Sequence, residues 1–355
     1  MLPLPTSVWP RCAADFPLFL RRRASFVAVA ALLAQSFLAA PAQAQSGTVQ
    51  ANGMTLAYES LGNPRRETIL LIGGTGSQLT QWPDSFCQAL VAKGFRVIRY
   101  DQRDCGLSTR LEAAGLPDWS GIMTRLAAGQ SAPLAYTLSD MARDAVGLLD
   151  ALGIRRAHVV GASMGGMIAQ LVATTYPARV LSLTSLMATD GKPSLPPIAK
   201  PEVMAQAPPP PTDQDTAAAL VYGVRTRQLL GSPAYPTAEA AIRAEVAREL
   251  HRSYYPAGYQ RQAAAALVES LHDRRAQLRM LQVPTLVVHG DADPLVPVAA
   301  GQDVAATIPG AEWRLLPGMG HEVPLQLVPV LVDAITAVAT RAHPRQTMHA
   351  QPRPR

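Results

Sequence analysis

The 355-residue sequence is best understood outward from one stretch, Val159-Val160-Gly161-Ala162-Ser163-Met164-Gly165-Gly166. β-Branched residues lead into a Gly-x-Ser-x-Gly pattern, and apolar residues continue at helical spacing through Val172. A strand, a sharp turn and a helix in this order hold the serine in a strained backbone conformation, clear of the sheet. Gly161 and Gly165 fit this turn because a side chain at either place would collide with a neighbouring element. We therefore predict that Ser163 is a nucleophile; the alternative is a serine that caps a helix.

Strands and helices alternate on both sides of this turn. Two short alternating runs around Asn52-Gly53 predict a β-hairpin. The segment 109–136 is predicted to be irregular. The alternation predicts an α/β fold with a mostly parallel central sheet, right-handed crossovers and flanking helices. Apolar patterning places strands at 67–72, 95–100, 157–162, 179–186, 284–289 and 312–316, and helices at 82–93, 138–152, 164–176, 297–307 and 322–341.

The alternation is interrupted once, by an insertion at 190–281. It begins with a Pro-rich stretch (190–211) and continues with three Ala-rich stretches, which predict helices at 213–230, 237–253 and 258–281. We interpret this insertion as a helical cap over the sheet. The core is then built from two parts, residues 45–189 and residues 282–340. Residues 341–355 are rich in Arg, Pro and Gln and are predicted to be disordered.

The first 44 residues are typical of an export signal. Arg21-Arg22-Arg23 precede an Ala-rich apolar run, which ends at a small-x-small cleavage motif before Gln45. The alternative is a transmembrane anchor, but Gln35 and Ser36 interrupt the run. The paired arginines hint at twin-arginine export. We expect a bacterial periplasmic or secreted protein with no stable membrane anchor after signal cleavage.

The formal net charge of +6 is concentrated at the two ends of the chain. Residues 1–44 carry four arginines and one aspartate, and the last fifteen residues carry four arginines and no acid. The folded body is therefore nearly neutral, which argues against a nucleic-acid partner. Cleavage of the signal leaves Cys87 and Cys105, which we expect to be separate thiols, although export permits a disulfide. No Cys/His spacing predicts a metal site, and the chemistry below needs no cofactor.

A serine nucleophile needs a base and an orienting acid. His321 follows the last predicted strand in a glycine-rich turn, which makes it the candidate base. The candidate acid is Asp293, which also follows a strand. Asp291 is the less favoured choice because it suits a turn-binding role, and Asp190 is a third possibility. The order Ser163, Asp293, His321 is the chain order that accompanies this kind of serine turn.

An oxyanion requires two backbone donors. The amide of Met164, at the positive end of its helix, is one candidate. Thr75 is the other, because it lies in the glycine-rich turn Gly73-Gly74-Thr75-Gly76 after a predicted strand. The alternative use of that turn, as a phosphate-binding loop, matches neither established glycine spacing.

These motifs resemble those of the α/β-hydrolases over roughly residues 48–340, and in particular the aclacinomycin methylesterase-like branch. The resemblance implies an α/β-hydrolase fold, catalytic roles for Ser163, Asp293 and His321, and oxyanion donors at Thr75 and Met164. Gly73 departs from the histidine or methionine that relatives often carry there. The segments that carry the resemblance are Leu70-Leu-Ile-Gly-Gly, Trp82-Pro83, Val97-Ile-Arg-Tyr-Asp-Gln-Arg-Asp104, Gly106-x-Ser108, Ala157-His-Val-Val-Gly-x-Ser-Met-Gly165, Pro284-Thr-Leu-Val and Pro317-Gly-Met-Gly-His321.

The function expected from these features is that of an exported serine hydrolase, which cleaves an apolar, small-molecule carboxylic ester through an acyl-enzyme. A lactonase, a perhydrolase or a C–C bond hydrolase would use the same three residues, and a non-catalytic binding protein of this fold is the alternative from another class. Serine at position 163 argues against epoxide hydrolase and haloalkane dehalogenase chemistry, which similar enzymes run through a carboxylate. The natural substrate and the oligomeric state are left open.

Overall fold

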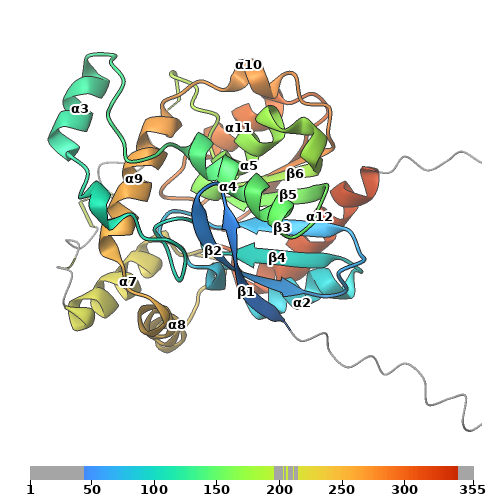
Figure 1. The fold of residues 1–355 in the computed structure, drawn as a ribbon, viewed down its shortest axis with the longest axis horizontal. Coiled ribbons are helices and arrows are strands. Elements are labelled where there is room, and N and C mark those ends of the chain that lie inside the picture. Colours follow the sequence, from blue (N-terminus) through green and yellow to red (C-terminus); the bar gives the residue numbers. More distant parts are fainter. Residues whose placement is uncertain (1–43, 196–202, 204, 207–210, 212–214, 343–355) are drawn as a thin grey trace, which may run out of the picture. The chain divides into compact units, whose positions relative to one another are not determined.

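The computed structural model describes residues 44–195, 203, 205–206, 211 and 215–342, which all lie in one compact unit. An eight-stranded sheet forms its centre, in the order β1-β2-β4-β3-β5-β6-β7-β8 (Figure 1). The strands are β1 (Gln45–Ala51), β2 (Met54–Leu61), β3 (Thr68–Ile72), β4 (Arg96–Tyr100), β5 (Ala157–Ala162), β6 (Val180–Leu186), β7 (Thr285–Gly290) and β8 (Glu312–Leu316).

The sheet is mostly parallel, as the sequence predicts. β1 and β2 form the expected antiparallel hairpin, and β2 also pairs antiparallel with β4. All pairings from β4 through β8 are parallel. The central strands β3 and β5 are buried along their whole length, which explains why their sequences are apolar apart from Thr68 and His158.

Helices cover both faces of this sheet. α4 (Leu138–Ala151), α5 (Met164–Thr175) and α11 (Val298–Thr307) pack on one face and enclose one hydrophobic cluster. α2 (Asp84–Ala92) and α12 (Val328–Arg341) pack on the other face and enclose a second cluster. Short 3-10 turns lie at Leu79–Gln81, Glu112–Ala114, Pro177–Arg179 and Leu325–Leu327.

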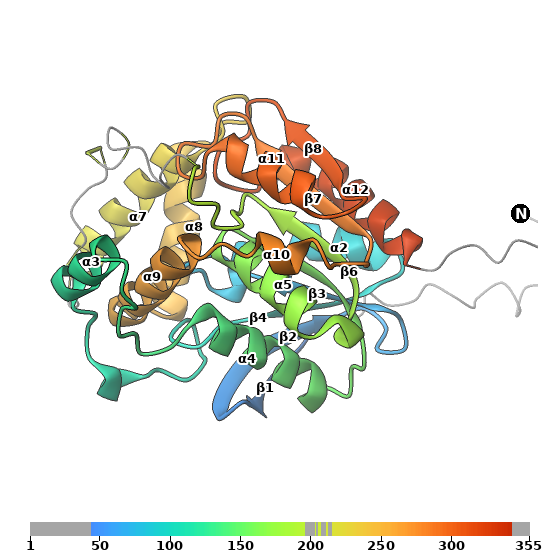
Figure 2. The same ribbon diagram turned by 90° about the horizontal axis from the view of Figure 1, so that it is seen from above.

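The insertion between β6 and β7 contains α7 (Thr216–Leu230), α8 (Glu239–Arg252), α9 (Pro256–Ser270) and α10 (Arg275–Leu278). Both ribbon views place α7 and α8 side by side and α9 next to α3 (Trp119–Ala127) (Figures 1 and 2). Hydrogen bonds join α8 and α9 to the loops that follow β3 and β4, so these helices lie at the carboxyl ends of the parallel strands.

Three boundaries differ from the prediction. The segment 109–136 contains α3, whose first turn is capped by the Asp118 side chain accepting from the Gly121 amide. The helix predicted at 258–281 is broken, because the chain turns after Ser270 to bring buried Arg274 against the end of β6. The helix predicted to begin at residue 322 begins at Val328, after Pro324 and a 3-10 turn.

Several predictions fall on other parts of the chain. The proposed signal peptide (1–44) lies outside the described residues except for Ala44, and so does most of the Pro-rich stretch beyond Leu195. The tail predicted to begin at residue 341 also lies outside them, except that α12 extends to Arg341 and Ala342 caps it. Cys87 and Cys105 are both buried free thiols.

Candidate active site

The turn at Ser163 has the strained backbone that its sequence predicts. Ser163 lies between β5 and α5 with φ 57° and ψ −124°, a region that residues with a Cβ rarely adopt. The glycines make this turn possible: a Cβ at Gly161 would collide with the Gly165 carbonyl, and one at Gly165 would collide with the Ile72 carbonyl. The Ser163 amide donates to the Leu186 carbonyl at 2.9 Å, which ties the turn to β6.

The structure brings the three predicted side chains into one hydrogen-bonded chain. His321 Nε2 lies 2.9 Å from Ser163 Oγ, and His321 Nδ1 lies 2.8 Å from Asp293 Oδ2. These residues come from the loops after β5, β7 and β8, at the same edge of the sheet. The arrangement fits an imidazole that takes the serine proton while the carboxylate fixes its tautomer.

Asp293 is held as an ionised, buried carboxylate. Its side chain is fully buried, and its Oδ1 accepts hydrogen bonds from the Leu295 and Val296 amides, both at 2.8 Å. His289 Nε2 lies 3.3 Å from Oδ2. Burial alone would raise the pKa of the Asp293 carboxyl, but the hydrogen bonds from His289 and His321 outweigh it and hold that pKa well below its usual range.

His289 is a site residue that sequence reasoning missed. Its fully buried ring lies against the same carboxylate oxygen as His321. His289 Nε2 also lies 3.0 Å from the Val296 carbonyl, so it is placed to donate to both oxygens. The short spacing His289-Gly-Asp-x-Asp293 indicates that the two side chains could lie close together. It does not tell which ring nitrogen faces the carboxylate.

The turn that carries His321 is held by the insertion. The His321 amide donates to the Leu230 carbonyl at 2.8 Å, and the Gly320 amide donates to Ser232 Oγ at 2.9 Å. The Ser232 amide in turn donates to Glu322 Oε1 at 2.9 Å. Because these contacts join residues about 90 positions apart, no local sequence motif predicts them.

The loop after β3 passes directly beside the serine. A Cβ at Gly74 would lie 3.5 Å from the Cβ of Ser163, which is ordinary van der Waals contact. The Gly74 amide donates to Gln81 Oε1 at 2.7 Å, and the Gly76 amide donates to Gln262 Oε1 at 2.6 Å. Within the described part of the chain, the amides of Thr75 and Met164 donate to no protein acceptor. These two amides are therefore available as candidate donors for an oxyanion.

The alternative acids lie elsewhere. Asp291 Oδ1 accepts from the Gly318 amide at 2.6 Å and so braces the turn that precedes His321. Asp190 is fully buried near Asp303 and accepts from the Lys192 amide. His158, inside β5, is fully buried, and its Nδ1 lies 2.9 Å from Ser182 Oγ.

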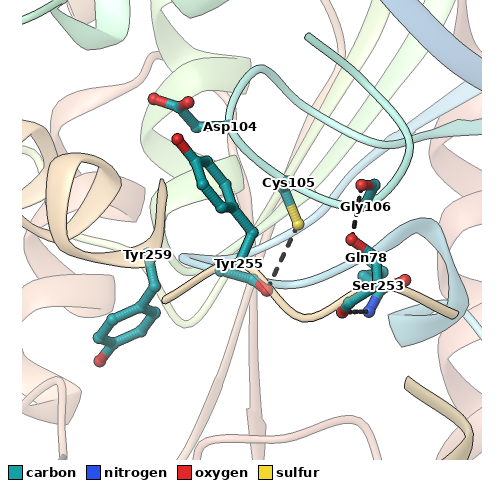
Figure 3. Close-up of a pocket in the computed structure, with 8 residues that line it drawn as sticks. Gln78, Asp104, Cys105, Gly106, Ser253, Tyr255 and Tyr259 are labelled. Atoms are coloured by element: carbon teal, nitrogen blue, oxygen red, sulfur yellow. Dashed lines mark hydrogen bonds between the residues drawn. The ribbon is translucent and has the colours of Figure 1, made fainter. Parts of the chain in front are cut away.

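A small cavity of about 40 Å³ lies next to the loop after β3 (Figure 3). Its walls include Gly76, Tyr255 and Tyr259, and the Cys105 thiol donates into it toward the Gly76 carbonyl. This volume suits a water molecule or two and not an organic substrate. Across the described residues, we find no group of three or more His, Cys, Asp or Glu side chains arranged to hold a metal ion. No helix in the same set of residues has the length and apolar character needed to cross a membrane.

Comparisons with known proteins agree with this architecture. A family model described as the alpha/beta hydrolase fold matches residues 67–326. The rhodomycin D methylesterase of Streptomyces peucetius is 31% identical over 310 residues, which cover 80% of this chain and 94% of that relative.

Solved structures that are similar to this chain have the same fold. The meta-cleavage product hydrolase CumD of Pseudomonas fluorescens has a TM-score of 0.65 at 18% identity, covering 84% of this chain and 98% of its own. The enol-lactonase of Burkholderia xenovorans has a TM-score of 0.64 at 23% identity, covering 83% and 100%. The chain is therefore a member of the α/β-hydrolase family and belongs to its aclacinomycin methylesterase-like branch.

Proposed function

We propose that this protein hydrolyses carboxylic esters through an acyl-enzyme formed on Ser163. The observation that carries the proposal is the continuous path of hydrogen bonds from Asp293 through His321 to Ser163, at 2.8 Å and 2.9 Å. A hydroxyl is a weak nucleophile at neutral pH, and an adjacent oriented base is the established way to activate it.

Acylation is the first half of the reaction. His321 Nε2 takes the proton of Ser163 Oγ as that oxygen bonds to the ester carbonyl carbon. The amides of Thr75 and Met164 donate to the oxyanion, and the Asp293 carboxylate stabilises the imidazolium. The bond from carbon to the alcohol oxygen then breaks, and His321 returns the proton to the departing alcohol.

Deacylation repeats these steps with water. His321 accepts a proton from a water molecule, whose oxygen attacks the acyl carbon on Ser163. The bond to Oγ breaks, Oγ regains the proton from His321, and the carboxylic acid leaves. Ester and water are consumed, acid and alcohol are formed, and the protein ends unchanged.

The substrate proposal rests on the relatives. Because the similar Streptomyces peucetius protein is a methylesterase, we propose an ester with a small alcohol group. The Ala- and Leu-rich helices of the insertion favour an uncharged or hydrophobic acyl group. A panel of methyl esters, p-nitrophenyl esters of graded acyl length and lactones separates ester hydrolysis from the other reactions of the fold.

We further propose that the protein acts in the bacterial periplasm or outside the cell. The support is the arginine-led, Ala-rich segment at residues 1–44. Fractionation of cells that express the full chain should recover a shortened protein outside the cytoplasm. Recovery of the full-length chain in the cytoplasm would contradict export.

Ser163→Ala tests the proposed chemistry. It should reduce ester turnover to the background rate while the thermal unfolding midpoint stays nearly unchanged, because only one oxygen is removed. Reaction of the wild-type protein with a fluorophosphonate separates an enzyme from a binding protein, since an unactivated serine does not react. Ester turnover that persists in Ser163→Ala would refute the assignment.

A further inference from the structure

One buried glutamine of the insertion reaches into the loop that flanks the nucleophile candidate. Gln262 lies on α9, is fully buried, and its Oε1 accepts from the Gly76 amide at 2.6 Å. Its Nε2 donates to the Arg103 carbonyl at 2.7 Å. One carboxamide thus joins the loop after β3 to the loop after β4.

The hydrogen bonds of the loop show what this contact does. The Gly74 amide is taken by Gln81, the Gly76 amide by Gln262, and the Ser77 amide by the Gly74 carbonyl at 3.3 Å. Among amides 74–77 in the described structure, only that of Thr75 donates to no protein acceptor. Gln81 and Gln262 therefore bind the amides on either side of Thr75, whose own amide is proposed to donate to the oxyanion.

Contacts on both sides of Gln262 hold this part of α9 in place. The preceding residue, Arg261, pairs with Asp104 through two hydrogen bonds of 2.7 Å and 2.8 Å. On the other side, Ala264 and Ala265 are almost completely buried. Because α9 is fixed on both sides of Gln262, the position of the carboxamide is set by the helix. The loop after β3 is therefore positioned by the carboxamide.

The loop needs such a constraint. Gly76 has φ +68°, a left-handed conformation that glycine adopts without strain but does not enforce, since glycine is the most flexible residue. The ring of Tyr259 packs where a Cβ of Gly76 would lie. The Gln81 contact holds the loop on one side of Thr75, and the hydrogen bond to Gln262 holds the amide on the other side.

We propose that Gln262 is a positioning residue, through which the insertion holds the Thr75 amide in place for the oxyanion. This rests on the proposed ester hydrolysis and adds a role for the insertion beyond covering the substrate. An oxyanion donor acts in the transition state, so misplacing it lowers kcat and leaves substrate binding largely unchanged.

The test compares Gln262→Met with Gln260→Met. Gln260 lies on the same helix, and its Oε1 accepts from Trp119 Nε1 at 2.7 Å, away from the loop. Turnover is expressed per serine titrated by fluorophosphonate, which removes any effect of a smaller folded fraction. Removal of a whole oxyanion donor costs about 100- to 1,000-fold in kcat, so we expect Gln262→Met to lose at least about tenfold, with KM within about twofold. Gln260→Met should stay within about twofold of the wild type.

A second variant guards against misfolding. Gln262→Asn keeps a polar amide but is one methylene too short to reach both partners, and it should show the same loss of kcat. A trifluoromethyl ketone, which forms a tetrahedral adduct, should bind more weakly by the same factor as kcat/KM falls.

Wild-type kcat per titrated serine in both Gln262 variants would overturn the proposal. So would equal losses in Gln260→Met and Gln262→Met. Failure of the proposed function itself looks different, because the wild-type protein would then neither hydrolyse esters nor react with the fluorophosphonate.

Discussion

Ser163 combines a strained backbone with a side chain at the centre of the proposed reaction. Its φ of 57° is compatible with the fold only because Gly161 and Gly165 leave room for the chain to reverse. Strain of this kind costs roughly 1–3 kcal/mol and persists where the surroundings enforce it. In return, Oγ is presented to His321 at the carboxyl edge of the sheet.

Relief of this strain is measurable. Ser163→Gly should be more stable than Ser163→Ala by about 1 kcal/mol, because glycine accepts the backbone conformation that alanine does not. Part of the gain is offset by the greater freedom of glycine in the unfolded chain. Urea unfolding of the two inactive variants measures the difference, and a less stable Ser163→Gly would argue against strain at this turn.

At the scale of elements, the sequence predicts the features that depend on residues close together in the chain. The strands, the serine turn and the placement of Asp293 and His321 follow from local apolar patterns, together with the rule that parallel strands share a carboxyl edge. Helix α3 was missed because it packs against the insertion and not on the sheet, so its pattern is short.

Other contacts were beyond the reach of the sequence because their partners are distant. Gln262 is 186 positions from Gly76, and Ser232 is 88 from Gly320. Gln262 stands beside a run of alanines that signals only a helix. Nothing local shows that this one polar side chain faces the loop after β3.

The junction between the end of β6 and α11 contains two neighbouring carboxyl groups, the buried Asp190 and the half-buried Asp303. Burial, followed by the neighbouring Asp303, raises the pKa of Asp190 to about 6, while the Lys192 amide and Arg274 oppose the shift. Lys192 Nζ pairs with Asp303 Oδ1 at 2.6 Å. Because the folded state binds the Asp190 proton more tightly than the unfolded chain, stability is lost as the pH rises from about 4 to about 6.

Asp190→Asn removes this titration, because its neutral amide can donate to Asp303 at every pH. The variant should gain stability over the wild type between pH 4 and pH 6, by up to about 3 kcal/mol, and keep that gain at pH 7.5. Unfolding midpoints at a series of pH values measure the gain, with Asp333→Asn as an exposed single-charge control. A difference that does not change with pH would contradict this account.

At the scale of the whole molecule, the insertion is joined to the core by buried and part-buried polar contacts. Arg261 pairs with Asp104, Arg252 pairs with Asp101 at 2.8 Å, and Ser253 Oγ donates to the Gly106 carbonyl at 2.7 Å. Together with Ser232, these contacts fix the insertion to the loop after β4 and to the turn that carries His321. The insertion is therefore part of the site's framework.

Removing one partner of the Arg261–Asp104 ion pair should lower the free energy of unfolding. Arg261→Met leaves the fully buried Asp104 carboxylate without its guanidinium, which we expect to cost about 3–5 kcal/mol of unfolding free energy. The double variant Arg261→Met with Asp104→Asn should recover part of that loss, because no unpaired charge remains. Urea unfolding of both variants is the measurement, and additive losses would show that the two residues do not interact.

The central claim is that His321 activates Ser163 across the edge of the sheet. The most direct measurement is the rate at which a fluorophosphonate modifies the protein, with the modified peptide identified by mass spectrometry. We predict modification at Ser163 in the wild-type protein and a rate at least about 100-fold lower in His321→Ala. Modification at another residue, or an unchanged rate at Ser163 without the imidazole, would contradict the account.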